Sequence, residues 1–268
     1  IDSAALMRNV MRYSRMFDLP IMTHCEDRSL SGKGVMNEGY TASCLGLSGM
    51  PREAEELQVA RNILLAEITG ARLHIAHVST GGSVRMVRDA KKRGLQVTCE
   101  TCPHYFALTE EAVEDYNTFA KVNPPLRTQE DVEAILEGIA DGTIDAIASG
   151  HSPTSRTDKD KEFGNAAYGI SALETAFPIS FTKLVETGII SLARLVELMS
   201  KKPAEILKLE QKGEIAVGKD ADLIVIETKG TQIIEPELFA SKAKFSPFAG
   251  QEVKGKVIYT IVGGKIVS

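Results

Sequence analysis

Short apolar segments alternate with longer amphipathic segments over the first 150 residues of this 268-residue chain. Segments of strand length occur at 19–24, 72–78, 95–100 and 144–149. Segments with helical spacing of apolar residues occur at 3–17, 51–69, 81–93 and 128–141. This alternation is typical of βα units, which build a parallel sheet covered by helices. Four such units predict an α/β fold that corresponds to half of a (β/α)8 TIM-type barrel.

The pattern changes near residue 208. Helices are expected at 171–186, 191–199 and 203–207, followed from Gly213 by short strands joined by tight glycine turns, with Gly263-Gly264 as a hairpin signal. We therefore predict a barrel half over 1–208 and a small antiparallel β-domain over 209–268. The chain opens at Ile1 directly into a capped helix pattern without a preceding strand. We expect it to begin within a longer protein.

Charge and composition argue against nucleic acid and membranes as partners. The formal net charge is −5, and no block of lysine and arginine is long enough to neutralise a run of phosphates, which argues against nucleic acid. No apolar run reaches the about 20 residues that cross a bilayer, and no signal peptide is recognisable, so a cytoplasmic location is expected. Cys99 and Cys102 form a lone CxxC, which we interpret as two reduced, buried thiols near a strand end.

Polar residues follow three of the predicted strands. His24 and His77 end the first two, and Gly150 stands beside His151 after the fourth. The carboxyl ends of parallel strands meet at one edge of the sheet, and a neutral imidazole is a good zinc ligand. His74 and His77 are an odd number of residues apart and point to opposite faces of a strand, so only His77 is a candidate ligand. A histidine that merely hydrogen-bonds at a strand end is the simpler alternative.

Seven short motifs are spread along the chain. They are Thr23-His-Cys-Glu-Asp27, Ala76-His-Val-Ser79, Glu100-Thr-Cys-Pro-His-Tyr105, Lys121-Val-Asn-Pro-Pro-Leu-Arg127, Gly169-Ile-Ser-Ala-Leu-Glu-Thr175, Ala221-Asp-Leu-Ile-Val225 and Ile261-Val-Gly-Gly-Lys265. They occur in the order found in dihydroorotases of the amidohydrolase superfamily. Over essentially its whole length the chain resembles the bacterial monofunctional dihydroorotases. Hydantoinases, dihydropyrimidinases and allantoinases share the architecture, and an allantoinase- or hydantoinase-like cyclic amidohydrolase is the alternative within the same enzyme class.

The resemblance implies a hydrolase built around one or two zinc ions. Such enzymes interconvert L-dihydroorotate and N-carbamoyl-L-aspartate in pyrimidine biosynthesis. By resemblance, His24 and His77 are zinc ligands on the fifth and sixth barrel strands, and Asn123 contacts the substrate. Ala167, Tyr168 and Gly169 belong to a loop that closes over it. A homodimer and an association with aspartate transcarbamoylase are further expectations.

Three departures from the family pattern weigh against activity of this chain by itself. Gly150 stands where the family has the aspartate that transfers a proton, and Thr154 stands where many dihydroorotases have a substrate-binding histidine. The His-x-His-x-Arg motif of the first strand and the bridging ligand are not in the chain. We expect no appreciable turnover by the chain alone, and restored turnover on Gly150→Asp in a longer protein if the glycine is the only defect. A non-catalytic homologue that acts as a structural partner is the alternative from another class.

Overall fold

A four-stranded parallel sheet forms the centre of the larger part of the molecule. The computed structural model describes all residues from Ile1 to Ser268. The sheet has the order β1-β4-β5-β6, and its strands are β1 (Ile21–Thr23), β4 (Leu73–Ile75), β5 (Val97–Thr101) and β6 (Ala146–Ile147). All three pairings are parallel, which confirms the predicted βα units. Each strand is shorter than predicted, β5 by a single residue.

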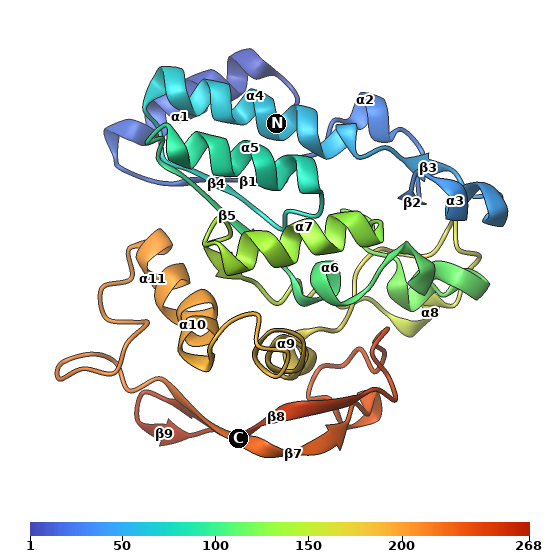
Figure 1. Cartoon of the computed structure of the whole chain (residues 1–268), viewed down its shortest axis with the longest axis vertical. Helices are drawn as coiled ribbons and strands as arrows, with labels where there is room; N and C mark the ends of the chain where they lie inside the picture. The colour runs from blue at the N-terminus through green and yellow to red at the C-terminus, as the bar shows by residue number, and fades with distance from the viewer.

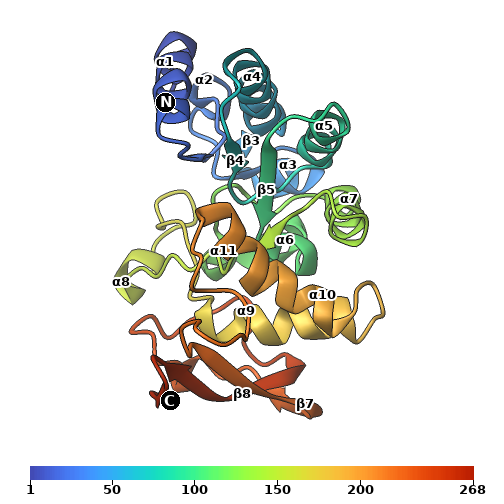
Figure 2. The same cartoon turned by 90° about the vertical axis from the view of Figure 1, so that its left-hand side faces the viewer.

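One helix precedes β1, and three more link or follow the strands on the outer face of the sheet (Figures 1 and 2). They are α1 (Ala4–Met16), α4 (Glu53–Thr69), α5 (Gly81–Lys92) and α7 (Gln129–Ala140). Side-chain oxygens of Ser3, Thr80 and Thr128 cap α1, α5 and α7 by accepting a backbone N–H of the first turn. Fully buried Val59, Val87 and Ile135 pack α4, α5 and α7 into the main hydrophobic core. The amphipathic spacing in the sequence thus corresponds to the face that each helix buries.

Several short elements were not anticipated from the sequence. Between β1 and α4 lie α2 (Arg28–Ser31), β2 (Met36–Asn37), α3 (Tyr40–Leu45) and β3 (Gly49–Met50), with β2 and β3 paired in parallel. After β5 come α6 (Pro103–Ala107) and the 3₁₀ segments η1 (Glu110–Tyr116) and η2 (Thr118–Ala120), and after β6 comes α8 (Arg156–Lys159). All lie in the segments that follow the carboxyl ends of β1, β5 and β6.

A layer of helices lies between the parallel sheet and the C-terminal sheet (Figures 1 and 2). It contains α9 (Leu173–Ser180) with the π-helical turn η3 (Phe181–Val185), α10 (Leu192–Val196) with the π-helical turn η4 (Glu197–Lys201), and α11 (Lys202–Leu207). These elements confirm the helices predicted in this region. Pro203 is the second residue of α11, which continues the π-helical turn η4 without a break, so it lies within a longer helical stretch and not at a free helix start. None of the helices combines the length and the apolar character needed to span a bilayer.

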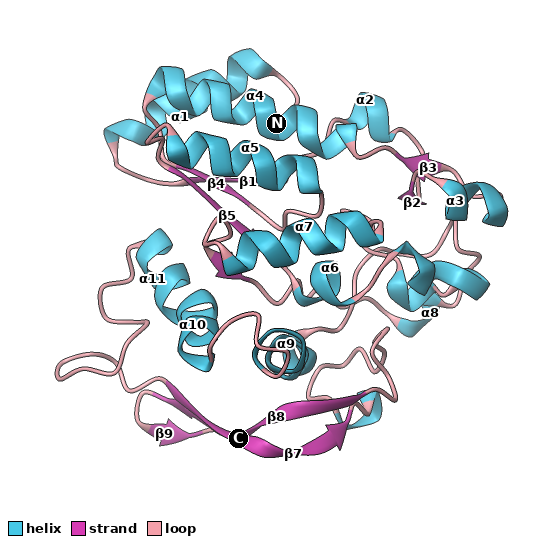
Figure 3. Cartoon of the chain, in the orientation of Figure 1, coloured by secondary structure: helices cyan, strands magenta, loops and turns pink.

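The chain ends in a three-stranded antiparallel sheet, shown in magenta at the bottom of Figure 3. Its strands are β7 (Leu223–Ile233), β8 (Glu252–Val262) and β9 (Lys265–Ile266), with the 3₁₀ turn η5 (Pro236–Leu238) after β7. Gly263 and Gly264 have φ of 53° and 77° and join β8 to β9, so the predicted hairpin is confirmed. A small core of its own lies against the helix layer and contains Ile179, Ile234, Phe239, Phe248 and Val253.

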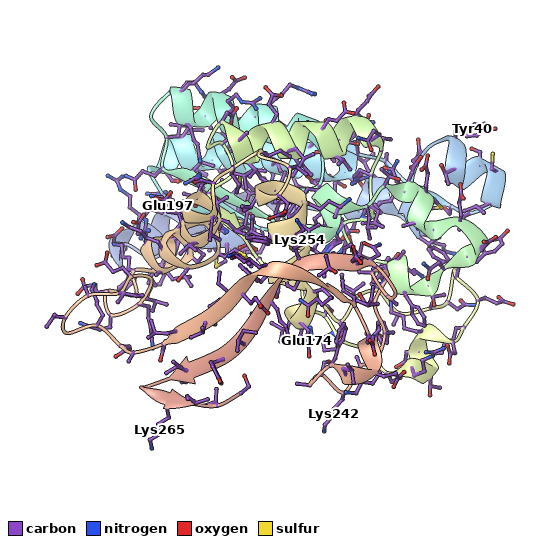
Figure 4. All side chains as sticks on the ribbon, turned by 60° about the horizontal axis from the view of Figure 1, so that its bottom comes forward. Tyr40, Glu174, Glu197, Lys242, Lys254 and Lys265 are labelled. Atoms are coloured by element: carbon purple, nitrogen blue, oxygen red, sulfur yellow. The ribbon has the colours of Figure 1, made fainter.

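Two contacts fasten β8 to the helix layer. The backbone N–H of Lys254 donates to Thr182 Oγ1 at 2.8 Å, and Lys254 Nζ forms an ion pair with Glu186 Oε2 at 2.5 Å. Figure 4 shows Lys254 where the strand passes over this layer. The small sheet is therefore held by hydrogen bonds as well as by its apolar core.

Candidate active site

His24 and His77 meet at the carboxyl ends of β1 and β4. His24 directly follows the last residue of β1, and His77 comes two residues after β4. His24 Nδ1 lies 3.1 Å from His77 Nε2, and the two ring centroids are 4.8 Å apart. His74 is fully buried on β4, where its Nδ1 lies 2.8 Å from Thr98 Oγ1 on β5. The structure thus brings together the two histidines chosen from the sequence and leaves His74 apart from them.

The two imidazoles fit part of a zinc site. Two nitrogens bound to one tetrahedral zinc at 2.0–2.1 Å would lie about 3.3 Å from each other, close to the observed separation. His24 Nε2 is 3.0 Å from Glu26 Oε2, and a carboxylate on the second ring nitrogen is the usual arrangement for a metal-binding histidine. Across the chain, no group of three or more His, Cys, Asp or Glu side chains is placed to hold a metal ion. The residues present therefore fit two ligands of a metal site and not a full set.

His77 has an uncommon backbone conformation. Its φ is 41°, in the left-handed region, where a side chain other than glycine is strained. Hydrogen bonds on both sides hold it, from Ala76 N to Thr23 O at 3.0 Å and from Val78 N to Glu100 O at 2.8 Å. Burial lowers the pKa of His77, and the nearby His24 lowers it further. The neutral imidazole, which is the form that binds metals, is favoured.

A buried carboxylate supports the segment that follows His77. Glu55, in the first turn of α4, accepts hydrogen bonds from the backbone N–H groups of Ser79 and Thr80 at 3.1 and 3.2 Å, and from both hydroxyls. Arg127 Nε donates to Ser79 Oγ at 3.1 Å, and Arg127 Nη1 donates to Asn37 Oδ1 at 2.8 Å. This network connects α4, the loop after β4, β2 and the Asn-Pro-Pro-Leu-Arg segment. Sequence reasoning missed Glu55, because a glutamate in a first helical turn ordinarily faces solvent.

Asn123 is connected to the histidine pair through Glu26. Asn123 Nδ2 donates to Glu26 Oε2 at 3.1 Å, and Ser31 Oγ donates to Glu26 Oε1 at 2.5 Å. Burial raises the pKa of Glu26, but hydrogen bonds from His24, Ser31 and Asn123 lower it by more, so the net pKa is lowered. The carboxylate therefore stays ionised while it orients the imidazole. Glu26 was visible in the His-Cys-Glu-Asp motif, yet the sequence alone assigned it no role.

The segment 167–169 lies beside the strand-like segment that leads to Asn123. The Gly169 N–H donates to Lys121 O at 2.9 Å, and the Tyr168 hydroxyl donates to Gly34 O at 2.9 Å. Gly169 has φ of 112°, and a Cβ there would overlap the Ser152 carbonyl oxygen, so only glycine fits. The segment 167–169 is thus tied to the backbone two residues before Asn123. Its contact with a substrate stays a prediction.

Gly150 lies against two buried side chains. Its φ is +64°, and a Cβ added to it would lie 2.5 Å from His104 Cε1 and 3.0 Å from Cys102 Sγ. Burial lowers the pKa of His104 to about 3, with a further contribution from His77, and its Nδ1 has no hydrogen-bond partner. The imidazole of His104 therefore takes space that a side chain at position 150 would need. The sequence could not reveal that His104 lies against Gly150, because their proximity depends on the paths of the segments that follow β5 and β6.

Two neighbouring groups do not replace the missing carboxylate. Asp145 Oδ2 accepts from Lys91 Nζ at 2.6 Å and from the Cys99 N–H at 2.9 Å, on the side away from the strand ends. His151 Nδ1 accepts from the N–H groups of Ala172 and Leu173 at the start of α9. The prediction that Asp145 cannot substitute for the aspartate is consistent with these contacts.

The thiols are free and mostly buried. Cys99 and Cys102 are fully buried and unpaired, as predicted, and burial raises the pKa of Cys99 to about 12. Cys25 is also buried, and burial raises its pKa to about 11. Thiols with such pKa values are poor nucleophiles and poor metal ligands near neutral pH. The CxxC segment is therefore part of the core.

Comparisons with known proteins find similar sequences over the whole chain. The profile of the Amidohydrolase family matches residues 1–267. The chain is 49% identical over 267 residues to a dihydroorotase of Acetivibrio thermocellus, a match that covers 100% of this chain and 62% of the relative. It is 52% identical over 266 residues to a dihydroorotase of Caldanaerobacter subterraneus subsp. tengcongensis, covering 99% of this chain and 61% of that relative. The chain thus spans about 62% of the length of the curated relatives that it matches.

Solved structures show the same architecture. An L-hydantoinase (dihydropyrimidinase) from Arthrobacter aurescens superposes with a TM-score of 0.89 at 30% identity, covering 99% of this chain and 60% of that one. A dihydropyrimidinase from Brevibacillus agri superposes with a TM-score of 0.87 at 26% identity, covering 97% of this chain and 59% of that one. The family profile, the relatives and the shared architecture lead to one conclusion: this chain belongs to the amidohydrolase family.

Proposed function

We propose that this chain forms the second half of a zinc-dependent dihydroorotase, a hydrolase that interconverts L-dihydroorotate and N-carbamoyl-L-aspartate. The observation that carries the proposal is the convergence of His24 Nδ1 and His77 Nε2 at the carboxyl ends of adjacent parallel strands. It occurs in a chain about half identical to dihydroorotases over its whole length. His24 and His77 would hold the metal together with ligands that this chain does not supply.

Each residue of the site would have a distinct task. When bound, zinc supplies the Lewis acidity that makes water a nucleophile near neutral pH and polarises an amide carbonyl. Glu26 orients the His24 ring, and Asn123 is held by Glu26 with its side chain at the site. The backbone of 167–169 would limit the space around the substrate. Gly150 carries no group that can transfer a proton to the leaving nitrogen, so we propose that the chain alone has no appreciable activity.

Gly150 also favours a second candidate, a non-catalytic homologue that supports the assembly of a partner enzyme. The two imidazoles and the Glu26 contact favour the catalytic reading, because a scaffold has no use for a metal-orienting carboxylate. Homodimer formation, association with aspartate transcarbamoylase and a cytoplasmic location rest on the resemblance and on composition alone, and they stay predictions.

Zinc binding by the chain tests the metal part of the proposal. Equilibrium dialysis should detect weak binding of one zinc ion, weakened about 10-fold or more in His24→Ala and in His77→Ala, as for loss of a ligand. His74→Gln is the matched control, since His74 lies on the same segment but bonds to Thr98, and it should bind zinc as the unaltered chain does. Equal binding by all four proteins would contradict the assignment.

Substrate preference tests the reaction. A protein that contains this chain together with the remaining barrel strands should bind N-carbamoyl-L-aspartate or dihydroorotate in preference to hydantoin or allantoin. Turnover of hydantoin with no response to dihydroorotate would favour the other cyclic amidohydrolases. Dihydroorotate turnover by this chain alone, abolished by a chelator, would contradict the proposed inactivity.

A further inference from the structure

Two lysines are among the most completely buried side chains of the molecule. Lys121 is 2% exposed and Lys159 is 0% exposed. A buried ammonium group is costly unless all its protons find acceptors. All the hydrogen-bond acceptors of both groups are backbone carbonyl oxygens. Two lysines buried in this way do not contribute to the charge of the surface, so their role has to lie in the backbone groups that they bind.

The side chain of Lys121 reaches into the segment before Ala167. Its Nζ donates to the carbonyl oxygens of Phe163, Gly164 and Ala166 at 2.6, 3.1 and 2.8 Å, so the three protons of the ammonium have one acceptor each. The same nitrogen lies 4.6 Å from the centroid of the Tyr168 ring, within cation–π distance. One side chain thus fixes the backbone from 163 to 166 and the ring that follows it.

Lys159 makes the reciprocal connection. It lies at the end of α8, and its Nζ donates to Thr118 O at 2.9 Å and to Lys121 O at 3.3 Å. The Gly169 N–H donates to the same Lys121 carbonyl at 2.9 Å. The segments 118–123 and 156–169 are therefore braced in both directions, each by a lysine of the other. We call this pair of contacts the lysine brace.

The lysine brace lies two residues from Asn123, which is connected to the histidine pair through Glu26. We propose that Lys121 is a positioning residue, and that the lysine brace sets the distance between the backbone of Ala167–Gly169 and the side chain of Asn123. This inference rests on the proposed function, in which those residues face the substrate. The segment then acts as a fixed wall of the site and not as a freely moving lid.

Amide hydrogen exchange tests the brace without any need for activity. In the unaltered chain, the N–H groups of Ala167 and Gly169 should be protected. In Lys121→Met they should exchange about 10-fold or more faster, because three carbonyl groups lose a charged donor, while amides of the core helix α4 keep their rates. Lys161→Met is the matched control. Lys161 lies in the same segment but is half exposed and pairs only with Asp158, so its loss should change exchange little.

Two outcomes would overturn the brace. One is rapid exchange of Ala167 and Gly169 in the unaltered chain, a measurement that needs no variant and stands even if Lys121→Met fails to fold. The other is unchanged exchange in a folded Lys121→Met protein. Lys121→Arg, which keeps the charge, should fall between the unaltered chain and Lys121→Met.

Dihydroorotate binding by the longer protein separates positioning from mere stability. Lys121→Met should raise the Kd for dihydroorotate several-fold and leave the Kd for zinc unchanged, since the wall and not the histidine pair is loosened. Faster exchange with an unchanged Kd for dihydroorotate would keep the lysine brace and overturn its role at the substrate. Absence of dihydroorotate binding by the unaltered longer protein would contradict the proposed function, and the exchange result would be unaffected.

Discussion

At the scale of single residues, Gly150 is a position near the candidate site where the structure leaves little room for a side chain. Gly150 combines a left-handed backbone with the imidazole of His104 in the space that a Cβ would occupy. The substitution Gly150→Asp therefore meets two obstacles, the left-handed backbone of residue 150 and the imidazole ring of His104. The expectation that Gly150→Asp alone restores turnover holds only if His104 can move.

Gly150→Asp should destabilise the chain by about 2–4 kcal/mol, the sum of overpacking and of a side chain at positive φ. Urea denaturation measures this. The matched control is Gly46→Asp, because Gly46 has the same φ of +64° and no atom within 4 Å of an added Cβ. Its cost should be only the backbone part, about 1–2 kcal/mol. Equal losses in the two variants would show that His104 is no obstacle.

At the scale of elements, the periodicity of apolar residues predicted the long helices and the repeated βα units. The four strands, the four outer helices and the Gly263-Gly264 hairpin were predictable, because each has a strong local pattern. The segments α2 to β3 and α6 to η2 were missed, since their elements are mostly two to seven residues long and carry no measurable period. Those same segments contribute Asn37 and His104. The parts of the site that could not be predicted therefore lie where the sequence pattern is weakest.

Glu55 provides the test at this scale, because it joins α4 to the loop after His77. Glu55→Ala should cost about 3–5 kcal/mol of stability, since it removes the carboxylate that lies 3.9 Å from Nη2 of the buried Arg127 and leaves several donors without an acceptor. Urea denaturation gives the cost, and zinc dialysis should show weaker binding through the displaced His77. Glu53→Ala is the control, an exposed glutamate of the same helical turn. A loss no larger than that of Glu53→Ala would exclude the supporting role.

At the scale of the whole molecule, the sequence indicated the half barrel, the small sheet and the meeting of His24 with His77, which are 53 residues apart. It did so because parallel strands must bring their carboxyl ends to one edge. It could not indicate that two lysines are buried, because lysine is ordinarily exposed and only the folded loops provide its acceptors. The boundary near residue 208 stays a prediction, although the two apolar clusters are separate.

The buried lysines should appear in the pH dependence of stability. Burial, with a further contribution from Lys121, lowers the pKa of Lys159 from 10.5 to about 8. Between these two values the unfolded chain binds this proton and the folded chain releases it, so the contribution of Lys159 to stability rises with pH. Below pH 8 both states carry the proton, and the cost of burying the charge is fully present.

Comparison with Lys159→Met isolates this effect. Urea denaturation of both proteins should show the unaltered chain gaining stability relative to Lys159→Met from about pH 8 to about pH 10. Titrating groups that do not interact with Lys159 cancel in the difference. A difference that stays level or falls with rising pH would contradict a lowered pKa for Lys159.

His77 gives a practical warning to anyone who engineers this protein. Glycine at this position would relieve a left-handed backbone worth about 1 kcal/mol, so a search for heat resistance alone would favour replacing the histidine. The gain in melting temperature would come with the loss of an imidazole that the rest of the fold is arranged to present. Libraries of this chain that are selected for heat resistance should therefore keep residue 77 constant, because thermal stability favours glycine there whereas the proposed metal site needs histidine.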